Sequence, residues 1–257
     1  MISLVIPTLN EAENIGPLLT RLDSCQPRID EIIFVDDGST DGTCDRVRTL
    51  AGDSAVRLIE RAAPAFGLSG AIVAGAQAAL GDWLVVMDAD LSHPPEKIGE
   101  LLQPLLTGKA DMVIGSRYVP GGSTPGWPLW RKLLSRLAAA GAHPITGVHD
   151  SMSGFFAMPR KLLLELAPRA SGFKIAFEAL AQGGRNLRVV EIPILFRDRA
   201  RGLSKMSFAV AFIFALRWLV AMASRVFGGQ PAPVVFRAQS SAASPAKSST
   251  AANNMLP

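Results

Sequence analysis

The chain has 257 residues, 49% of them hydrophobic, enough to build one large α/β domain or two small ones. Its formal net charge of +4 is compatible with anionic substrates or a membrane surface and is too small to argue for nucleic-acid binding. The two cysteines, Cys25 and Cys44, form neither a disulfide framework nor a metal-ligand spacing, and no signal peptide is predicted, so a reduced, cytosolic setting is expected.

The first predicted strand covers residues 2–6, an apolar run that Pro7 closes. A helix follows, and its N-cap is predicted at Asn14 because Pro17 fits only in the first turn of a helix. The apolar residues after Asn14 keep helical spacing, which predicts that one face of this helix packs on the sheet.

The second predicted strand, residues 31–35, ends in two carboxylates, Asp36 and Asp37. The loop 38–42 after it consists of small and turn-forming residues, so its backbone N–H groups can lie close to a ligand. The alternative is an ordinary β–α turn in which Asp41 caps the following helix.

A third strand is predicted at 56–59, and the glycine-rich segment 67–71 leads into a helix at 72–80. The apolar run 83–87 is then short and β-branched enough to be a fully buried parallel strand. Strands and helices that alternate in this way over about ninety residues predict a doubly wound, mostly parallel sheet.

This central run ends abruptly in Asp88-Ala89-Asp90. If strand geometry persists, the two carboxylates point the same way and Ala89 turns inward. Two like charges at this distance need a cation, and Mg²⁺ or Mn²⁺ with oxygen ligands fits while leaving room for substrate phosphates. The alternative is a pair of solvated loop aspartates.

Three predicted strands therefore end in loops that can contact a ligand, at residues 7–8, 36–37 and 88–90. In a doubly wound sheet these strand ends share one edge, which is where such folds bind ligands. This convergence predicts a single site at that edge.

The second half continues the α/β pattern. A helix is predicted from Glu96 onward, a strand at 111–115 and a glycine- and proline-rich loop at 119–128. An amphipathic helix then begins near Trp130, and strands or helices follow to about residue 207.

The last fifty residues change character. Residues 208–228 are almost wholly apolar, and 229–257 have the composition of a disordered tail. Arg217 lies in the middle of the apolar run, where a spanning helix would be penalised by about 2.5 kcal/mol or more. An interfacial or re-entrant membrane helix is therefore favoured over a spanning helix or a buried soluble one.

In this order and spacing, the motifs VIPTLNEAENI, VDDGSTDGT, GLSGA, GDWLVVMDADLSHPPEKI, VIGSRYVPGG and MSGFFAMPR resemble those of family 2 glycosyltransferases of GT-A fold. MDADLSHPPE with GSRY and the RGLSK motif at 201–205 resembles more narrowly the polyprenol (dolichol-type) monophosphate mannose synthases. The resemblance covers residues 1–207 and implies one catalytic domain there, with the apolar helix and the tail appended.

The resemblance implies roles for particular residues. Those for the nucleotide sugar are Pro7, Leu9, Glu11, Val35, Asp37, Asp88, Ala89, Lys174, Arg199 and Lys205. The implied ligands of the Mg²⁺ or Mn²⁺ are Asp88, Asp90 and Ser92, where some relatives carry glutamine in place of the serine. The implied catalytic residues are Asp90, Arg117, Arg131 and Ser135, of which the last three hold the acceptor phosphate; Arg131 and Ser135 share a helix face.

The resemblance further implies inverting transfer of a hexose, with mannose from GDP-mannose favoured, to polyprenyl phosphate at the cytoplasmic face of the inner or plasma membrane. A phosphate acceptor is already an anion at neutral pH and needs no strong base. One alternative is a polyprenyl-phosphate glucosyltransferase that uses UDP-glucose. Another is a transfer to a saccharide hydroxyl, for which Glu178 or Asp150 would be the base. A non-catalytic membrane-surface module that keeps the fold is the third.

Overall fold

The computed structural model describes residues 1–51, 55–62, 66–166, 175–183, 186–198 and 234–237. Three predicted site residues, Lys174, Arg199 and Lys205, lie outside these ranges, as does the predicted apolar helix 208–228. None of the helices within the ranges is long and apolar enough to cross a bilayer.

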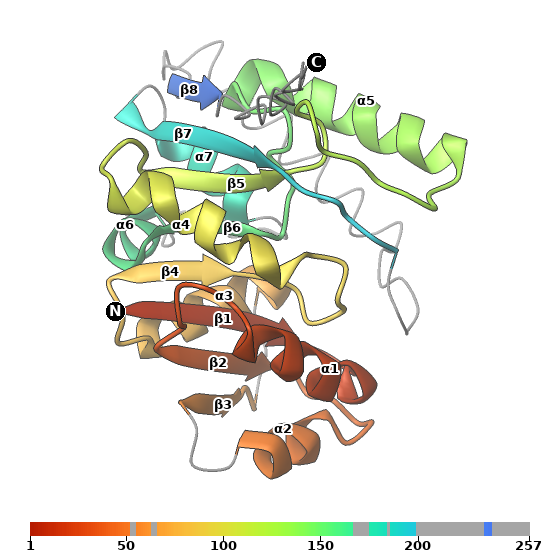
Figure 1. Ribbon diagram of the computed structural model, residues 1–257, viewed down its shortest axis with the longest axis vertical. Coiled ribbons are helices and arrows are strands. Elements are labelled where there is room, and N and C mark those ends of the chain that lie inside the picture. Colours follow the sequence, from red (N-terminus) through yellow and green to blue (C-terminus); the bar gives the residue numbers. More distant parts are fainter. Residues whose placement is uncertain (52–54, 63–65, 167–174, 184–185, 199–233, 238–257) are drawn as a thin grey trace, which may run out of the picture.

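The described strands form one sheet of mostly parallel strands (Figure 1). In chain order they are β1 (Ile2–Thr8), β2 (Glu31–Asp36), β3 (Val56–Glu60), β4 (Trp83–Val86), β5 (Met112–Ser116), β6 (Phe156–Pro159), β7 (Arg188–Pro193) and β8 (Val234–Arg237). Their order across the sheet is β3-β2-β1-β4-β6-β5-β7-β8, and only β6 runs antiparallel to its neighbours β4 and β5. The predicted α/β class and mostly parallel sheet are confirmed.

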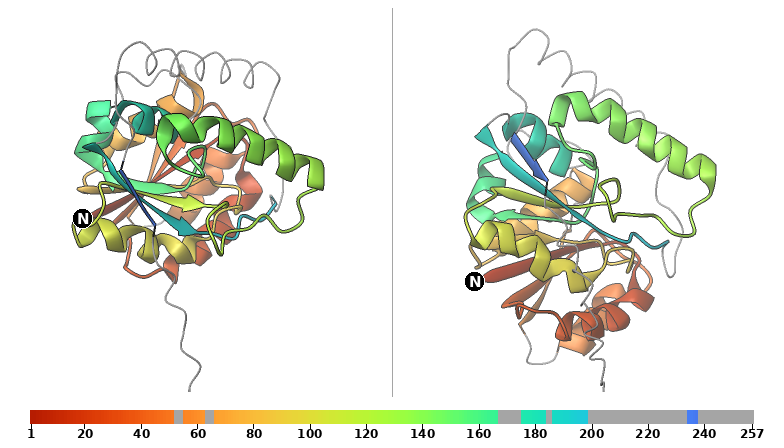
Figure 2. Two further views of the ribbon diagram at one scale, coloured as in Figure 1. Left: turned by 90° about the horizontal axis from the view of Figure 1, so that it is seen from above. Right: turned by 45° about the horizontal axis from the view of Figure 1, so that its top comes forward.

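Helices cover both faces of the sheet (Figure 2). They are α1 (Ala12–Asp23), α2 (Thr43–Ala51), α3 (Gly67–Ala78), the 3-10 turn η1 (Pro95–Lys97), α4 (Ile98–Leu106), α5 (Leu129–Thr146), α6 (Arg160–Leu166) and α7 (Ile175–Gly183). Along β1 the side chains of Leu4 and Ile6 join the core under α1 and α4, whereas Val5 joins the core under α3. Both faces of the central strands are thus buried, as their unbroken apolar runs predict.

Strand β1 extends two residues further than predicted, because Pro7 lies inside it and Thr8 ends it. The ladder between β1 and β4 ends at Val5 and Val86, whereas the ladder with β2 continues through Pro7. Pro7 lacks an N–H, and it lies where β1 has a strand neighbour on one side only, so the proline is tolerated.

The predicted start of the first helix is wrong. Helix α1 begins at Ala12, Asn14 is not its cap, and Pro17 lies inside the helix. The N–H groups at the helix start bond instead to the first residue of α2 and to the loop before it: Thr43 Oγ1 accepts from Glu11 N at 2.8 Å and Asp41 Oδ2 accepts from Ala12 N at 3.0 Å. The acceptors come from about thirty residues away, so local sequence gave no sign of them.

The C-terminal prediction also needs one correction. Val234–Arg237, within the segment predicted as a disordered tail, form strand β8, which pairs in parallel with β7. The other residues of that segment lie outside the described ranges.

Candidate active site

The carboxyl ends of β1, β2, β4 and β5 lie along one edge of the sheet (Figure 1). At this edge the side chain of Thr8 donates to Asp36 Oδ2 at 3.1 Å, and Asp37 N donates to Thr8 O at 3.1 Å. The loop after β4 follows directly, since Met87 N donates to Val5 O at 3.2 Å. The three predicted loops therefore meet, as the doubly wound pattern requires.

The two carboxylates after β2 have different surroundings. Asp36 is 1% exposed and accepts from Gly38 N at 3.0 Å and Ser39 N at 2.8 Å. Burial by itself raises the pKa of the Asp36 carboxyl, but hydrogen bonds, led by those from Ser39, outweigh burial and hold the pKa below its ordinary value. Asp36 is thus an ionised structural group that shapes the loop.

Asp37, predicted to contact the donor nucleotide, forms an ion pair with Arg61, with 3.0 Å between Asp37 Oδ1 and Arg61 Nη1. Burial raises the pKa of the Asp37 carboxyl; Arg61 offsets part of this rise, and the negative charge of Asp36 adds to it. Arg61 was not among the residues predicted for the site. Its fixed position beside Asp37 is a structural finding.

The 38–42 loop also bonds to the start of α2. Asp41 Oδ1 accepts from Thr43 N, the first N–H of this helix, at 3.0 Å and from Thr43 Oγ1 at 2.5 Å, whereas Gly42 directly precedes the helix. The second carboxylate oxygen serves α1, so one aspartate joins the starts of two helices. These bonds do not exclude a ligand near the loop's backbone.

The other nucleotide-site predictions fall into two kinds. Pro7, Val35 and Ala89 are buried. Leu9 and Glu11 lie at the surface, and Glu11 Oε2 accepts from Asn14 Nδ2 at 2.7 Å. All five residues stay predictions.

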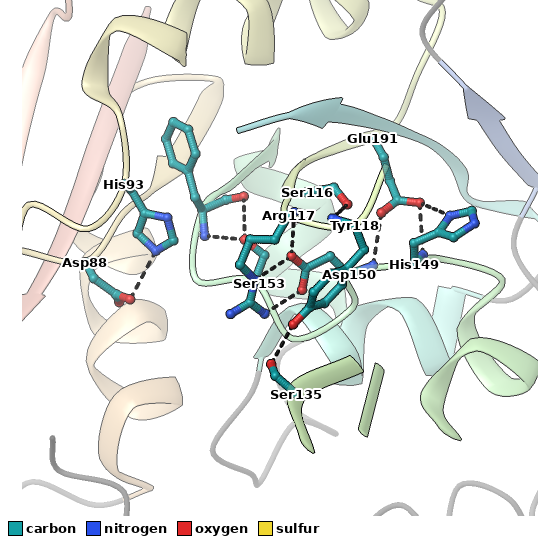
Figure 3. Close-up of polar contacts among 11 residues, drawn as sticks. Asp88, His93, Ser116, Arg117, Tyr118, Ser135, His149, Asp150, Ser153 and Glu191 are labelled. Carbon is teal, nitrogen blue, oxygen red and sulfur yellow. Dashed lines mark hydrogen bonds and ion pairs between the residues drawn. The ribbon is translucent and has the colours of Figure 1, made fainter. Parts of the chain in front are cut away.

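The strand geometry expected for Asp88-Ala89-Asp90 does not persist, because β4 ends at Val86. Ala89 does turn inward and is 2% exposed. The Asp88 side chain is 32% exposed, and its Oδ2 lies 3.2 Å from His93 Nε2 (Figure 3). A Cβ at position 154 would come within 2.7 Å of that same oxygen, so Gly154 gives the carboxylate its space.

Asp90 is 3% exposed, and its Oδ1 accepts from Ser92 N at 3.1 Å and from Ser92 Oγ at 2.5 Å. Leu91 between them has a φ of +62°, a strained value for a leucine. The loop therefore brings two of the predicted metal ligands, Asp90 and Ser92, into direct contact. Strained backbone of this kind is frequent at functional sites.

The donor atoms of this loop suit a hard divalent ion. Asp88 and Asp90 supply carboxylate oxygens and Ser92 a hydroxyl, the oxygen chemistry that Mg²⁺ and Mn²⁺ prefer. Within the described residues no group of three or more His, Cys, Asp or Glu side chains surrounds one point. A small protein ligand set leaves positions for water or substrate phosphate, as is usual for Mg²⁺.

On the other side of the site, Arg117 forms a two-pronged ion pair with Asp150 (Figure 3). Arg117 Nε and Nη2 each lie 2.7 Å from a different oxygen of the carboxylate, and Arg117 N donates to it at 2.9 Å. Burial alone would lower the pKa of the Arg117 guanidinium, but the Asp150 carboxylate raises it above its ordinary value. This leaves Nη1 as the guanidinium nitrogen not bonded to Asp150.

A buried glutamate supports Asp150 from behind. Glu191, 1% exposed in β7, accepts from Asp150 N at 3.0 Å and from His149 N at 2.9 Å, and its Oε2 lies 2.9 Å from His149 Nδ1. Glu191 was not among the predicted site residues. The signal that could have found it was a charged residue inside the apolar strand run VVEIPI.

The two predicted acceptor residues of α5 lie near Arg117 but do not contact it directly. Ser135 Oγ is 2.5 Å from the hydroxyl of Tyr118, the residue next to Arg117 (Figure 3). Arg131 lies over the Trp127 ring, with 3.9 Å from its Cζ to the ring centre, and its Nη1 is 3.0 Å from Asp198 Oδ1. Arg117 also faces Trp127, at 5.7 Å, so one buried tryptophan lies against both arginines.

Comparison with known proteins identifies the family. The sequence model described as "Glycosyl transferase family 2" matches residues 3–167. The chain belongs to this family. Family 2 membership agrees with the fold and with the acidic loop at the sheet edge.

Curated relatives of this family 2 chain cover most of its length. It is 41% identical over 218 residues to a dolichol-phosphate mannosyltransferase of Saccharomyces cerevisiae, which covers 80% of each chain. It is 40% identical over 210 residues to one of Pyrococcus furiosus, covering 80% of this chain and 59% of that protein. It is 38% identical to a polyprenol monophosphomannose synthase of Mycolicibacterium smegmatis, covering 79% of this chain and 80% of that one.

Among solved structures, the family 2 fold resembles glucosyl-3-phosphoglycerate synthase from Mycobacterium tuberculosis, in complex with Mn²⁺, UDP-glucose and phosphoglyceric acid. The TM-score is 0.63 at 26% sequence identity, over 90% of this chain and 80% of that one. Divalent-metal use is thus shown for a protein of the same fold.

Proposed function

We propose that the protein transfers mannose, from GDP-mannose, to polyprenyl phosphate with inversion at the anomeric carbon. The observation that carries this proposal is the placement of two arginines, Arg117 and Arg131, against one buried tryptophan, Trp127. The names of the relatives in yeast, Pyrococcus and Mycolicibacterium support the same acceptor and sugar.

The acceptor half of the site suits a phosphate. Arg117 is fixed by Asp150, and it keeps Nη1 for a further acceptor atom. Arg131 pairs with the half-exposed Asp198, a contact that an incoming phosphate can replace at little cost because exposed ion pairs contribute roughly 0–1 kcal/mol. Ser135 adds a hydroxyl donor beside them.

The donor half suits a nucleoside diphosphate. Asp88 and Asp90, with Ser92, are the residues that would hold a divalent ion, and when bound this ion stabilises the negative charge of the departing diphosphate. Asp37 and the segment 7–11 would take the base and ribose. Arg199 and Lys205, outside the described ranges, are proposed to contact the diphosphate.

No strong general base is needed for this reaction. A phosphate acceptor is an anion at neutral pH, so its oxygen can attack the anomeric carbon directly. The chain's contribution is to hold donor and acceptor in line and to shield the site from water. Glu178 in α7 is then dispensable for proton removal.

We expect Asp90→Ala to abolish transfer and Glu178→Ala to reduce it much less. Equal and complete loss of transfer in both variants would argue for a hydroxyl acceptor.

The test is a transfer assay with purified protein, labelled GDP-mannose, UDP-glucose and other nucleotide sugars, a polyprenyl phosphate and Mg²⁺ or Mn²⁺. Label from GDP-mannose in the organic phase is the expected result. The solved relative bound to UDP-glucose makes a UDP-glucose-dependent glucosyltransferase the second candidate. Transfer from UDP-glucose alone, or to a soluble saccharide alone, would overturn the proposal.

A membrane surface is part of the same proposal because the acceptor is a lipid. Helix α5 extends from the site along the outside of the molecule (Figure 2). It carries exposed apolar side chains of 60% exposure or more at Leu129, Trp130, Leu133, Leu134 and Leu137. Its charged residues are all basic, and no Asp or Glu occurs from 129 to 146. A helix of this kind binds the interface of an anionic bilayer. We place the protein at the cytoplasmic face of the inner or plasma membrane.

Vesicle binding tests this surface. In sedimentation with vesicles that contain phosphatidylglycerol, the double variant Leu133→Ser and Leu137→Ser should lose most of its binding, because two apolar side chains leave the lipid. Leu106→Ser, which changes a 53% exposed leucine on α4, is the matched control and should bind like the wild type. Equal binding by all three would remove α5 from the membrane surface.

A further inference from the structure

The segment after β7, residues 194–198, crosses the candidate site from its acceptor side to its metal side. Ile194 N donates to Ser116 O at 3.0 Å, and Phe196 N donates to Ser123 O at 2.9 Å. One residue later, Arg197 N donates to Ser92 O at 3.1 Å. Backbone bonds therefore fasten this crossing segment to β5, to the 119–128 loop and to the acidic loop.

The Phe196 ring lies at the centre of this crossing segment and meets a ring on each side. The centre of the His93 ring is 5.0 Å away at an interplanar angle of 78°, and the Trp127 ring is 5.5 Å away at 82°. Both are edge-to-face arrangements, which aromatic pairs favour. His93, Phe196 and Trp127 thus form a continuous row, here called the aromatic bridge.

Each end of the aromatic bridge contacts a side chain with a proposed role in the reaction. At one end, His93 Nε2 lies 3.2 Å from Asp88 Oδ2. At the other end, Trp127 lies 3.9 Å from Arg131 Cζ and 5.7 Å from Arg117 Cζ, and Phe196 itself lies 5.3 Å from Arg117 Cζ. Flat guanidinium groups over aromatic faces are held by cation–π attraction.

The two end members of the bridge are buried, and the central Phe196 is partly exposed. His93 is 2% exposed and also stacks on Phe155 at 5.4 Å, and Trp127 is 7% exposed. Buried rings in close-packed surroundings have few alternative rotamers. By contrast Leu195, next to Phe196, is 50% exposed.

We propose that His93, Phe196 and Trp127 are positioning residues that hold the Asp88 carboxylate and the Arg117–Arg131 pair at a fixed separation, so that the donor and the acceptor phosphate meet in line. This inference rests on the proposed function. Direct displacement without a base depends almost entirely on such placement, and a shift of about 1 Å can lower a rate roughly a hundredfold.

The central test is Phe196→Leu, which keeps an apolar side chain and removes the ring. We expect kcat to fall about tenfold or more, while the KM values for donor and polyprenyl phosphate change by about twofold or less, because each half still binds its own substrate. Phe196→Tyr retains the ring and should restore most of the rate. Leu195→Ala, the matched control on the same segment, should keep the wild-type kcat.

Binding experiments that need no turnover should distinguish the roles of the two ends of the bridge. Trp127→Leu should weaken farnesyl phosphate binding about tenfold in calorimetry and leave Mn²⁺ binding in the presence of GDP unchanged. His93→Leu should weaken Mn²⁺ binding in the presence of GDP about tenfold and leave farnesyl phosphate binding unchanged, because it removes the ring nitrogen that helps to orient the Asp88 carboxylate. Thermal unfolding of every variant reports whether a loss comes from misfolding.

The inference and the proposed function fail in different ways. If the wild type makes no lipid-linked sugar, the proposed function is wrong, and the bridge is judged by the binding experiments alone. If the wild type is active and Phe196→Leu matches Leu195→Ala in kcat, the bridge is wrong. Uniform losses in both binding experiments, or no loss in either, would also overturn it.

Discussion

Two carboxylates at opposite edges of the same sheet, Glu31 and Asp88, have different surroundings. At the amino edge, Glu31 is 4% exposed and accepts from Ser3 Oγ at 2.5 Å, from the backbone N–H groups that precede β4, and from Arg57 Nη1 at 3.0 Å. At the carboxyl edge, the Asp88 side chain is 32% exposed beside an imidazole. One acid is buried among donors of the protein itself, whereas the other is partly exposed.

This difference distinguishes a carboxylate that stabilises the fold from one that remains able to bind a ligand. A carboxylate saturated by internal donors has little capacity for a ligand, so Glu31 ties three strands together. The acids at the carboxyl edge depend on loops that begin where strand pairing stops. We expect substitutions of the acids after β4, at the carboxyl edge, to change activity more than stability, and substitution of Glu31 at the amino edge to do the opposite.

The largest expected effect on activity comes from Asp90→Asn. Removing the charge while keeping the shape should lower kcat by at least about a hundredfold, because the proposed divalent ion loses a carboxylate. The measurement is the transfer assay across a range of Mn²⁺ concentrations. Asp82→Asn, an 85% exposed acid at the amino edge, is the control. Full activity of Asp90→Asn would mean that this carboxylate is structural only.

The largest expected effect on stability comes from Asp150→Ala. Asp150 is fully buried, and its loss leaves the buried Arg117 guanidinium without a counter-charge, which costs about 3–5 kcal/mol. Urea unfolding of the purified variant measures this change. Because Asp150 belongs to the site, transfer should fall as well, which makes this pair the exception to the contrast between the edges. An unchanged unfolding midpoint would show that the pair is not formed.

Glu31→Gln tests whether the buried acid at the amino edge contributes to stability rather than to activity. The free energy of unfolding should fall by about 1–3 kcal/mol, while kcat at neutral pH stays within twofold. Burial raises the pKa of Glu31, but hydrogen bonds from Ser3 and the backbone outweigh burial and lower it below its ordinary value. A lowered pKa in the folded state adds stability above the unfolded value, near 4.5, and this is lost as pH falls through the folded value. Wild type and variant should therefore converge in stability in acid.

The last prediction concerns Cys44, beside the Asp36 loop, and involves neither turnover nor the free energy of unfolding. Burial, with the nearby carboxylates of Asp36 and Glu60, raises the pKa of the Cys44 thiol to about 12. At pH 8 its thiolate fraction is about a thousandth of that of an unperturbed thiol, so alkylation by iodoacetamide should be slower by a similar factor. Peptide mass spectrometry over time checks this for Cys44 alone. Rapid labelling would show that the Asp36 surroundings are looser than described.

Much of the fold could be predicted from periodicity. The runs that became β2, β4 and β5 were located to within one or two residues, since a buried parallel strand is an apolar run bounded by turns. The start of α1 was wrong because its hydrogen-bond acceptors, Asp41 and Thr43, come from another part of the chain. Long-range acceptors leave no local pattern, so capping rules applied to neighbours alone failed there.

For the candidate site too, some features could be predicted from local sequence and others depend on long-range contacts. Two carboxylates after a buried strand were enough to predict a polar site at the carboxyl edge. They could not predict that Asp90 turns back on Ser92, that Asp150 holds Arg117, or that Phe196 lies between His93 and Trp127. These contacts join residues from separate loops, and each depends on how several strands end relative to one another.

The sequence by itself determined the elements, their alternation, the edge where ligands bind and the resemblance to family 2, because spacing and residue type act over a few neighbouring positions. Only the tertiary structure decided which acid is saturated and which stays accessible, since that depends on donors that folding brings from distant segments. Burial then sets the outcome, because a buried charge needs partners nearby and a half-exposed one can exchange water for a ligand.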